Sequence, residues 1–429
     1  MNGWIIFILL IVLMLTGMPI SIALGLTVLT FLFLLTDLPA ELVSQRLFTG
    51  LDQFAIMAIP FFILAGTFLT HGGVARRMIR FATALVGHFH GGLAMAGVFA
   101  CALFAAVSGS SPATVVAIGT ILIPAMEKQG YPRKFGVGAI GTAGALGILI
   151  PPSIVMVIYS VSTNTSVGKL FIAGIVPGIL LAAILMGITW VIARRRDYPR
   201  MQRASLKEIW SAFWDAIWGL LLIVVVIGGI YGGVFTPTEA AAVSAVYAFV
   251  IAVFVYRDLK LSDVPKVLLA SANMSAMLLY IITNAILFSF LLTSENIPQA
   301  MAQWIIDKHL SVWMFLLGVN VLLLIAGNFM EPSSIVLLLA PILFPVAVKL
   351  GVDPIHFGII MTINMEVGLI HPPVGLNLYV ASGIAKMGLT ETTVAFAPWI
   401  VIMVLYLLLV TYVPQIATWL PDLVYARPA

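Results

Sequence analysis

Two proline pairs interrupt apolar stretches of the chain, and each lies close to small and polar residues. The first is within Gly147–Ser153 (GILIPPS) and the second is within Gly368–Val374 (GLIHPPV). A proline lacks a backbone donor and disfavours the helical conformation of the residue before it, so each pair predicts an unwound point in a helix. Within a bilayer such backbone is tolerated only where protein or a water-filled cavity satisfies it. Breaks at matching places in two halves therefore indicate a binding site.

A polar segment precedes each break and ends an apolar arm. These segments are Ser108–Pro112 (SGSSP) and Gly327–Ser334 (GNFMEPSS). Their hydroxyl, amide and carbonyl oxygens suit a weakly held alkali ion or proton rather than zinc. The candidate ligands for this coupling cation, as side-chain or backbone oxygens, are Gly109, Ser110, Gly141, Gly144, Gly147, Gly327, Asn328, Glu331, Ser334, Asn364, Glu366 and Gly368.

The same regions also offer helix N-termini, which follow Pro112, Pro152, Pro332 and Pro373. Free amides and the positive end of a helix dipole favour a carboxylate. We therefore expect an organic anion to bind beside the cation. The candidate substrate-binding residues are Ser108, Ser111, Thr142, Pro152, Ser153, Ser333 and Asn377.

Several of these residues also have a purely structural interpretation. Small residues and prolines can serve only close helix packing. Glu239 follows Thr236 and Pro237 in a capping-box pattern, so we interpret it as a cap. Glu331 fits a cap and a ligand equally well, whereas Glu366 is an intramembrane carboxylate and so a functional candidate. A lone His371 is interpreted as hydrogen-bonded scaffolding.

Composition identifies the environment of the chain. Its 429 residues are 62% hydrophobic and only 9% charged, and the mean hydropathy is +1.14. That leaves too few charges to cover a soluble surface, so we expect an all-α polytopic membrane protein. The first apolar run, Trp4 to Leu15, has no basic leader, so we expect it to be a structural element rather than a signal peptide. The single Cys101 excludes an internal disulfide.

The order of apolar and polar segments predicts two similar halves. The first repeat would occupy residues 1–200, with a re-entrant helical hairpin at 92–127 and a broken helix at 135–160. The second would occupy residues 218–429, with a hairpin at 314–349 and a broken helix at 357–383. Residues 201–217 are expected to form an interfacial amphipathic helix that links them.

Charge placement tests the topology of these halves. If each half crosses the membrane an odd number of times and the N-terminus is external, five of the 21 Lys and Arg residues lie outside: Arg46, Lys169, Lys308, Lys349 and Arg427. That asymmetry obeys the positive-inside rule. An odd number of crossings also makes the repeats inverted, as in many secondary carriers. We expect both termini to be external.

Four stretches resemble the large membrane subunit of tripartite ATP-independent periplasmic (TRAP) transporters. They are Gly232–Ala242 (GGVFTPTEAAA), the Ser108–Pro112 segment, Gly141–Pro152 and Gly368–Gly375. The resemblance implies a sodium-driven, elevator-type importer of organic acids in the bacterial inner membrane, with sodium at the cation positions. It also implies a separate four-helix membrane subunit and a periplasmic binding protein as partners. A nucleic-acid partner is not expected.

Other classes fit the sequence less well. An intramembrane enzyme would need paired acids, a metal motif or an activated nucleophile, and no such set is present. A channel would normally repeat a ring of residues across subunits. A stand-alone sodium- or proton-coupled carrier remains an alternative. The sequence leaves the substrate open among carboxylates, including sialic acids such as N-acetylneuraminate and C4-dicarboxylates.

Overall fold

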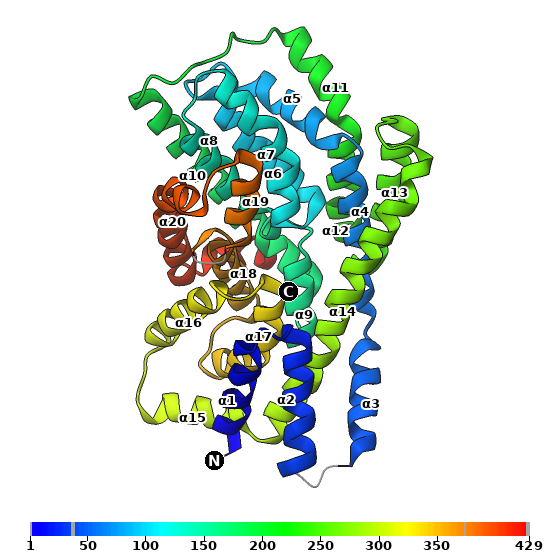
Figure 1. The fold of residues 1–429 in the computed structure, drawn as a ribbon, viewed down its shortest axis with the longest axis vertical. Coiled ribbons are helices and arrows are strands. Elements are labelled where there is room, and N and C mark those ends of the chain that lie inside the picture. Colours follow the sequence, from blue (N-terminus) through cyan, green and yellow to red (C-terminus); the bar gives the residue numbers. More distant parts are fainter. Residues whose placement is uncertain (1, 36–38, 373–374, 426–429) are drawn as a thin grey trace.

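The computed structural model describes the chain except residues 1, 36–38, 373–374 and 426–429. Throughout the described part, every regular element is a helix. Figure 1 shows an elongated molecule in which the N-terminal helices lie at one end and helices α5 and α11 lie at the other.

Among its described residues, the first half has ten α-helices and two short 3₁₀ segments. In chain order they are α1 (Asn2–Leu15), α2 (Ile20–Leu35), α3 (Ala40–Leu51), η1 (Phe54–Met57), α4 (Ala58–His71), α5 (Val74–Val86), α6 (Gly92–Ser108), α7 (Ser111–Lys128), α8 (Arg133–Ala143), η2 (Gly144–Ile148), α9 (Ile154–Thr163) and α10 (Val167–Arg195).

The second half continues with α11 (Leu206–Ile223), η3 (Val224–Gly228), α12 (Gly229–Tyr231), α13 (Pro237–Val250), η4 (Ile251–Val255), η5 (Leu261–Asp263), α14 (Val264–Ser294), α15 (Ile297–Asp307), α16 (Val312–Gly327), α17 (Pro332–Lys349), α18 (Pro354–Ile370), α19 (Leu376–Ala385), α20 (Leu389–Tyr412) and α21 (Gln415–Tyr425). Segments η3 and η4 are π-helical turns within longer helices.

The two proline pairs interrupt helices where the sequence predicts it. The first broken helix consists of α8, the 3₁₀ segment η2 and α9, with Pro151 and Pro152 in the gap. The second consists of α18, which ends just before His371 and Pro372, and α19, which begins after them at Leu376. Pro373 and Val374, which belong to the predicted second break, lie outside the described residues.

The linker differs from the expectation. The predicted interfacial helix at 201–217 is not separate from the span that follows, because one continuous helix runs over Leu206–Tyr231. Ser205 and Glu208 form the predicted capping box at its start. No proline lies between this cap and Tyr231, so nothing in the backbone stops the helix there.

The halves exchange contacts around the breaks. Helix α7 packs against α19, and α17 packs against α9 in the corresponding way. Helix α8 likewise packs against α20, and α18 against α10. Figure 1 places the α6–α7 pair in the upper half and α17 in the lower half. Each half therefore supplies part of the surroundings of the other half's break.

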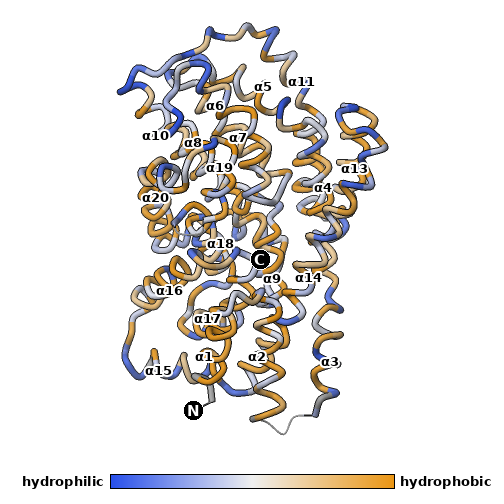
Figure 2. Tube along the Cα trace, viewed as in Figure 1, coloured by the Kyte–Doolittle hydropathy of each residue, from blue (hydrophilic) through white to orange (hydrophobic). Residues whose placement is uncertain are grey.

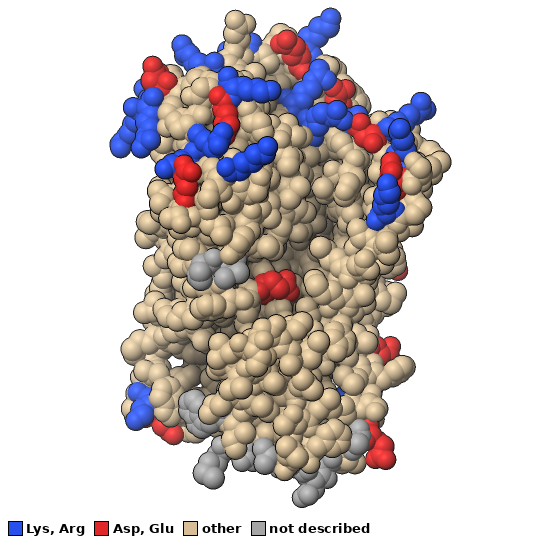
Figure 3. Space-filling view, viewed as in Figure 1, with Lys and Arg blue, Asp and Glu red and all other residues tan. Residues whose placement is uncertain are grey.

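The described part of the chain has seven helices long and apolar enough to cross a membrane. Figure 2 shows apolar residues along most helices and polar residues gathered mainly at the ends of the molecule. Figure 3 shows that Lys and Arg gather at one end, with few at the other. This distribution is the charge asymmetry expected of a multi-pass membrane protein.

Candidate binding centres at the helix breaks

The tip between α6 and α7 lies directly against the first helix break. A Cβ atom added to Gly109 would lie 3.0 Å from the Pro152 carbonyl oxygen, and one added to Gly147 would lie 2.6 Å from the Ser110 carbonyl oxygen. Gly109 also has a φ of 62°, which favours glycine. These glycines let the two backbones approach, so that their carbonyl oxygens gather in one place. We call this region the first centre.

Asn377 joins the first centre from the other half of the chain. It is fully buried in the first turn of α19. Its amide nitrogen donates to Ser111 Oγ at 2.8 Å and to the Gly141 carbonyl oxygen at 3.3 Å. The sequence predicts a binding role for Asn377 but not its position among first-half residues, more than 230 positions away in the chain.

Two buried oxygens of these residues have no partner. Thr142 Oγ1 and Asn377 Oδ1 make no hydrogen bond within the described part of the chain. Buried polar atoms are nearly always paired, so unpaired oxygens in native proteins call for an explanation such as a bound ion. The donor set of Thr142, Asn377, Ser111 and the Gly141 carbonyl is neutral and consists of hard oxygens. It therefore fits an alkali cation and does not fit zinc.

The serines of the first tip hold its backbone. Ser108 Oγ lies 2.9 Å from Thr114 Oγ1 and donates to the Ser110 carbonyl oxygen at 3.3 Å. Thr114 Oγ1 donates to the same carbonyl at 2.9 Å. Ser153 is fully buried and caps α9 by accepting the Met156 N–H at 3.3 Å. Gly144 lies against Val115 of α7, where a Cβ atom would not fit.

A cavity of about 180 Å³ lies between the first tip and helix α4. Its lining includes the polar residues Ser108, Ser110, Thr67 and His71 and the apolar Met274 of α14. Helix α4 comes close here, because a Cβ atom on Gly66 would lie 2.8 Å from the Ser108 carbonyl oxygen. Thr67 and His71 were not predicted as site residues. Their sequence signal is that they form a polar pair four residues apart at the end of an apolar helix.

The second tip meets the second break in a comparable way. A Cβ atom on Gly327 would lie 2.9 Å from Gly368 Cα. Asn328 Oδ1 lies 2.7 Å from His371 Nδ1, which ties the tip to the break and supports the interpretation of His371 as scaffolding. A cavity of about 100 Å³ lies beside these glycines and is lined also by Glu331. We call this region the second centre.

Glu331 is a helix cap in this structure. Its Oε1 accepts the Ser334 N–H at 3.2 Å and the Ser334 hydroxyl at 3.1 Å, at the start of α17. Ser333 and Ser334 are both buried. The carboxylate of Glu331 thus stabilises the N-terminus of α17 and lines the second cavity at the same time. Glu239 also caps a helix, α13, as predicted.

Asn364 belongs to a separate buried network. Its amide nitrogen donates to Asn320 Oδ1 at 2.8 Å, and the Asn320 amide donates to Thr411 Oγ1 at 3.0 Å. These contacts join α16, α18 and α20, and they leave Asn364 Oδ1 buried without a partner among the described residues. Asn320 was not predicted, although an amide in an apolar membrane helix is itself a functional signal.

Glu366 is fully buried, and neither carboxylate oxygen has a hydrogen-bond partner within the described residues. It lies two positions after Asn364 on α18, and residues two apart do not share a helix face. Tyr406 of α20 is close enough to interact with it electrostatically. The side chains of Asn364 and Glu366 therefore leave α18 in different directions.

Paired helix breaks, buried polar tips and membrane-length helices define a membrane transport protein rather than an enzyme. The fold is shared with a solved structure, the YdaH transporter of Alcanivorax borkumensis, with a TM-score of 0.65, 17% identity and 90% of each chain covered. Residues 7–416 match the model of the family described as tripartite ATP-independent periplasmic transporter, DctM component. The chain belongs to this family.

Curated relatives of this family carry the name large permease protein. The C4-dicarboxylate TRAP transporter large permease protein DctM of Rhodobacter capsulatus is 67% identical, with 99% of each chain covered. The sialic acid TRAP transporter large permease protein SiaM of Vibrio cholerae is 36% identical, with 96% of each chain covered. The family implies a periplasmic binding protein and a small membrane subunit as partners.

Proposed function

We propose that this chain is the sodium-coupled transport subunit of a tripartite importer of C4-dicarboxylates. The substrate class is supported by 67% identity to a relative named for C4-dicarboxylates, against 36% to one named for sialic acid. Among the carboxylates that the sequence leaves open, C4-dicarboxylates are therefore favoured over sialic acids.

The unpaired oxygens at the first centre carry the proposal of sodium coupling. Asn377 Oδ1 and Thr142 Oγ1 are buried and unpartnered, and the carbonyl oxygens of Gly141 and Ser110 belong to the same region. A cation placed among these oxygens replaces the missing hydrogen bonds and helps to hold α7, α8 and α19 together. Empty, the centre leaves buried oxygens uncompensated, which costs free energy. Sodium binding and ordering of the tip are therefore linked.

A second sodium ion is proposed at the second centre, among Gly327, Asn328, Glu331, Ser334 and Gly368. The cavity beside these residues and the adjacent carboxylate support it. Asn364 and Glu366 remain candidate cation ligands deeper in α18.

The substrate carboxylate is proposed to bind between the first tip and α4. Hydroxyl groups of Ser108 and Ser110 line the cavity there, and the N-terminus of the 18-residue helix α7 begins at Ser111. Backbone amides and the helix dipole at such a position favour an anion. Sodium bound at the adjacent first centre adds positive charge, so ion and dicarboxylate assist each other's binding. Thr142, Pro152, Ser153, Ser333 and Asn377 remain substrate candidates around the two breaks.

The remaining assignments follow the family and the charge asymmetry. We propose an inner-membrane location with the Lys- and Arg-rich end in the cytoplasm and both termini in the periplasm. The two halves are proposed to be inverted repeats, with the hairpins α6–α7 and α16–α17 and both broken helices forming the moving part of an elevator. The reciprocal packing of α7 on α19 and of α17 on α9 supports this assignment.

A sodium titration of transport tests the first centre. The chain is reconstituted in liposomes with its small membrane subunit, and uptake of labelled succinate is measured with the binding protein present. Ser111→Ala removes a hydroxyl beside Asn377, and we expect the sodium concentration for half-maximal uptake to rise about tenfold, since a lost buried polar contact costs ~1–2 kcal/mol. Ser244→Ala is the matched control, because its buried hydroxyl donates to the Ala240 carbonyl oxygen within α13.

An unchanged sodium titration in Ser111→Ala would remove this residue from the ion site. Loss of sodium dependence in both variants would indicate a general packing defect instead. Uptake without the binding protein would favour the stand-alone carrier, and uptake of N-acetylneuraminate in preference to succinate would overturn the substrate class.

A further inference from the structure

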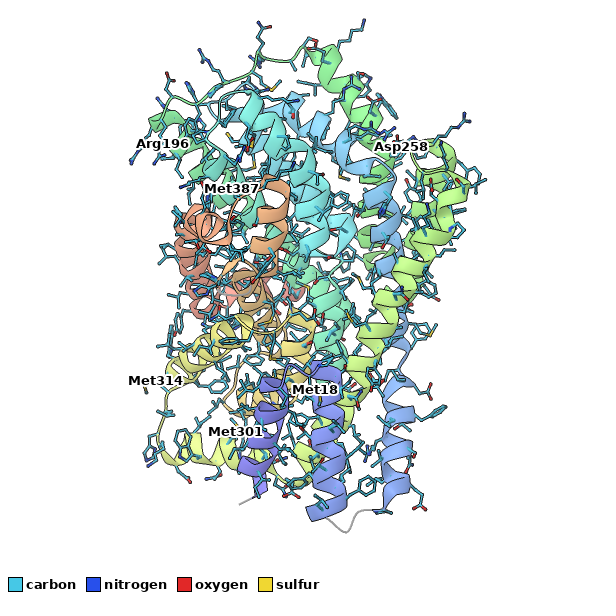
Figure 4. The ribbon with its side chains drawn as sticks, in the orientation of Figure 1. Met18, Arg196, Asp258, Met301, Met314 and Met387 are labelled. Carbon is cyan, nitrogen blue, oxygen red and sulfur yellow. The ribbon has the colours of Figure 1, made fainter. Side chains whose placement is uncertain are left out.

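A large basic cavity lies away from both binding centres, at the Lys- and Arg-rich end of the molecule. It measures about 660 Å³ and opens between α8, α10 and α20. Four basic residues line it, Arg133, Lys134, Arg195 and Arg196, against a single acidic one, Glu391. Figure 4 shows Arg196 at the upper left of the molecule, and Figure 3 shows basic side chains gathered in the same area.

Two of these arginines lack, among the described residues, the carboxylate partner that four arginines at the same end have. Arg76 and Arg77 pair with Asp258, Arg80 pairs with Asp215, and Arg133 pairs with Glu127. Within the described residues, Arg195 and Arg196 have no such carboxylate partner. Arg196 reaches only the Tyr198 hydroxyl, at 3.5 Å. Two guanidinium groups at the cavity therefore retain their capacity to bind an anion.

The walls of the cavity are apolar, and one of them continues along the membrane-facing surface. Phe135 and Trp399 form the inner wall, with ring centres 6.2 Å apart. On α20, Val394 lines the cavity, and Val394, Val401 and Leu405 are 58%, 60% and 62% exposed. Val401 and Leu405 follow Val394 by 7 and 11 positions, so all three residues share one helix face. An apolar stripe thus leads from the basic cavity down the outside of α20.

We propose that this cavity binds the headgroup of an anionic phospholipid. The phosphate would lie between Arg195 and Arg196, and the acyl chains would follow the stripe on α20. Basic pockets between membrane helices on the cytoplasmic side suit anionic headgroups, and the volume falls within the range of small-ligand sites. A soluble phosphate would use the arginines but would leave the apolar wall and stripe uncovered.

The bound lipid would steady the first arm of the broken helix. Helix α8 packs closely on α20 here, because a Cβ atom on Gly138 would lie 2.5 Å from Trp399 Nε1, and one on Gly141 would clash with the Phe396 ring. Gly141 is also the residue whose carbonyl accepts from Asn377 at the first centre. The lipid site and the first centre therefore share the α8–α20 contact.

Lipid-specific stabilisation tests the proposal. The complex of this chain with its small membrane subunit is purified in detergent, and its thermal unfolding is followed as dioleoylphosphatidylglycerol or dioleoylphosphatidylcholine is added; native mass spectrometry counts the bound lipid. We expect the anionic lipid alone to stabilise the wild type. Arg195→Ala with Arg196→Ala should lower its apparent affinity about thirtyfold, since each basic group near an anionic lipid surface contributes roughly 1 kcal/mol.

Two further variants make the result interpretable. Arg200→Ala with Arg203→Ala removes the same charge from the same end but outside the cavity, and it should keep the stabilisation. Val394→Trp keeps every charge, and so the topology signal, but places a bulky ring where the apolar stripe leaves the cavity. This variant should bind the lipid less tightly. Three results would overturn the site. The first is an equal loss of lipid stabilisation in the Arg200 and Arg203 variant, and the second is equal stabilisation by phosphatidylcholine or by glycerol phosphate. The third is full lipid binding by Val394→Trp.

Discussion

Single residues at the breaks show how the two halves differ in chemistry although they share an order of elements. At the first centre the polar groups are neutral, and the amide of Asn377 comes from the other half. At the second centre a carboxylate, Glu331, and an imidazole, His371, are present. An ion at the first centre thus depends on carbonyl and hydroxyl oxygens, whereas one at the second has a formal charge nearby.

Glu366 is the residue whose role is most open to a direct test. It is fully buried with no partner for either oxygen among the described residues, and an ionised carboxylate in that position is costly unless it is compensated. We expect Glu366→Gln to assemble normally and to raise the sodium concentration for half-maximal uptake about tenfold, because an amide oxygen replaces a charged ligand. Sodium titration of succinate uptake measures this.

The control for Glu366 is Asn273→Ala, which removes a polar side chain from the exposed side of α14 and should leave the titration unchanged. Wild-type sodium dependence in Glu366→Gln would show that the carboxyl group is not a sodium ligand.

Sequence patterns pointed to most polar residues of the two candidate centres but not to the contacts between them. Proline pairs and small residues mark the breaks, and capping patterns mark Glu239, because these signals act over a few neighbouring residues. The contact between Asn377 and Ser111 joins residues 266 positions apart, and no local pattern contains that information. Asn320 was overlooked because its neighbours are all apolar, although a buried amide within such a helix needs a partner.

At the scale of elements, helix α5 is held by charges at the basic end of the molecule. Arg76 Nη2 lies 2.8 Å from Asp258 Oδ1, and Arg77 pairs with the other carboxylate oxygen. Arg77 also lies over the Tyr256 ring, 3.7 Å from its centre. These contacts fasten α5 to the turn between α13 and α14.

The Asp258 contact predicts a pH-dependent stability. Burial alone raises the pKa of Asp258, but the hydrogen bond from Arg77 and the charges of Arg77 and Arg76 outweigh it and bring the pKa below its ordinary value of 3.8. A lowered pKa stabilises the fold above 3.8, and the contribution is lost as pH falls through the folded-state value. We expect Asp258→Asn to cost about 1 kcal/mol near neutral pH.

Thermal unfolding of the purified complex measures this difference. The gap between Asp258→Asn and wild type should stay constant between about pH 5 and 8 and shrink below about pH 4. Asp52→Asn, at an exposed acid with no ion pair in the described residues, is the control. A gap that is the same at every pH would assign the effect to packing rather than to the ion pairs.

Four helices were not predicted, and all four for the same reason. Helices α3, α5, α15 and α21 have 11 to 13 residues and lie between or after longer apolar runs. Helix α5 contains Arg76, Arg77 and Arg80 within its first two turns, which resembles a basic loop when only hydropathy is considered. Short amphipathic helices gain most of their stability from tertiary packing, so their sequence signal is weak. The longer apolar helices were predictable because their composition marks them, and the breaks because proline pairs mark them.

At the scale of the whole molecule, the reciprocal packing has a mechanical consequence. Helix α7 packs on α19 and α17 on α9, so each hairpin is fastened to the broken helix of the other half. In the proposed elevator, a body joined in this way would move as a unit, and its motion relative to α4 and α14 would occur across the cavity beside the first tip. That boundary is where the elevator proposal can be tested.

Cross-linking across this boundary should stop transport. Thr67 of α4 and Ala113 of α7 line the same cavity, and Cys101 is the only native cysteine. In a Cys101→Ala background, Thr67→Cys and Ala113→Cys are joined by a short bismaleimide. This cross-link should abolish succinate uptake, because α4 and α7 can no longer separate.

Gly119→Cys with Ile384→Cys is the matched pair, since a Cβ atom on Gly119 would lie 3.3 Å from Ile384 Cδ1. Both positions lie within the proposed moving body, so their cross-link should leave uptake intact. Full uptake with the first pair cross-linked would mean that α4 travels with the hairpin, and the moving body would then have to be drawn along a different boundary.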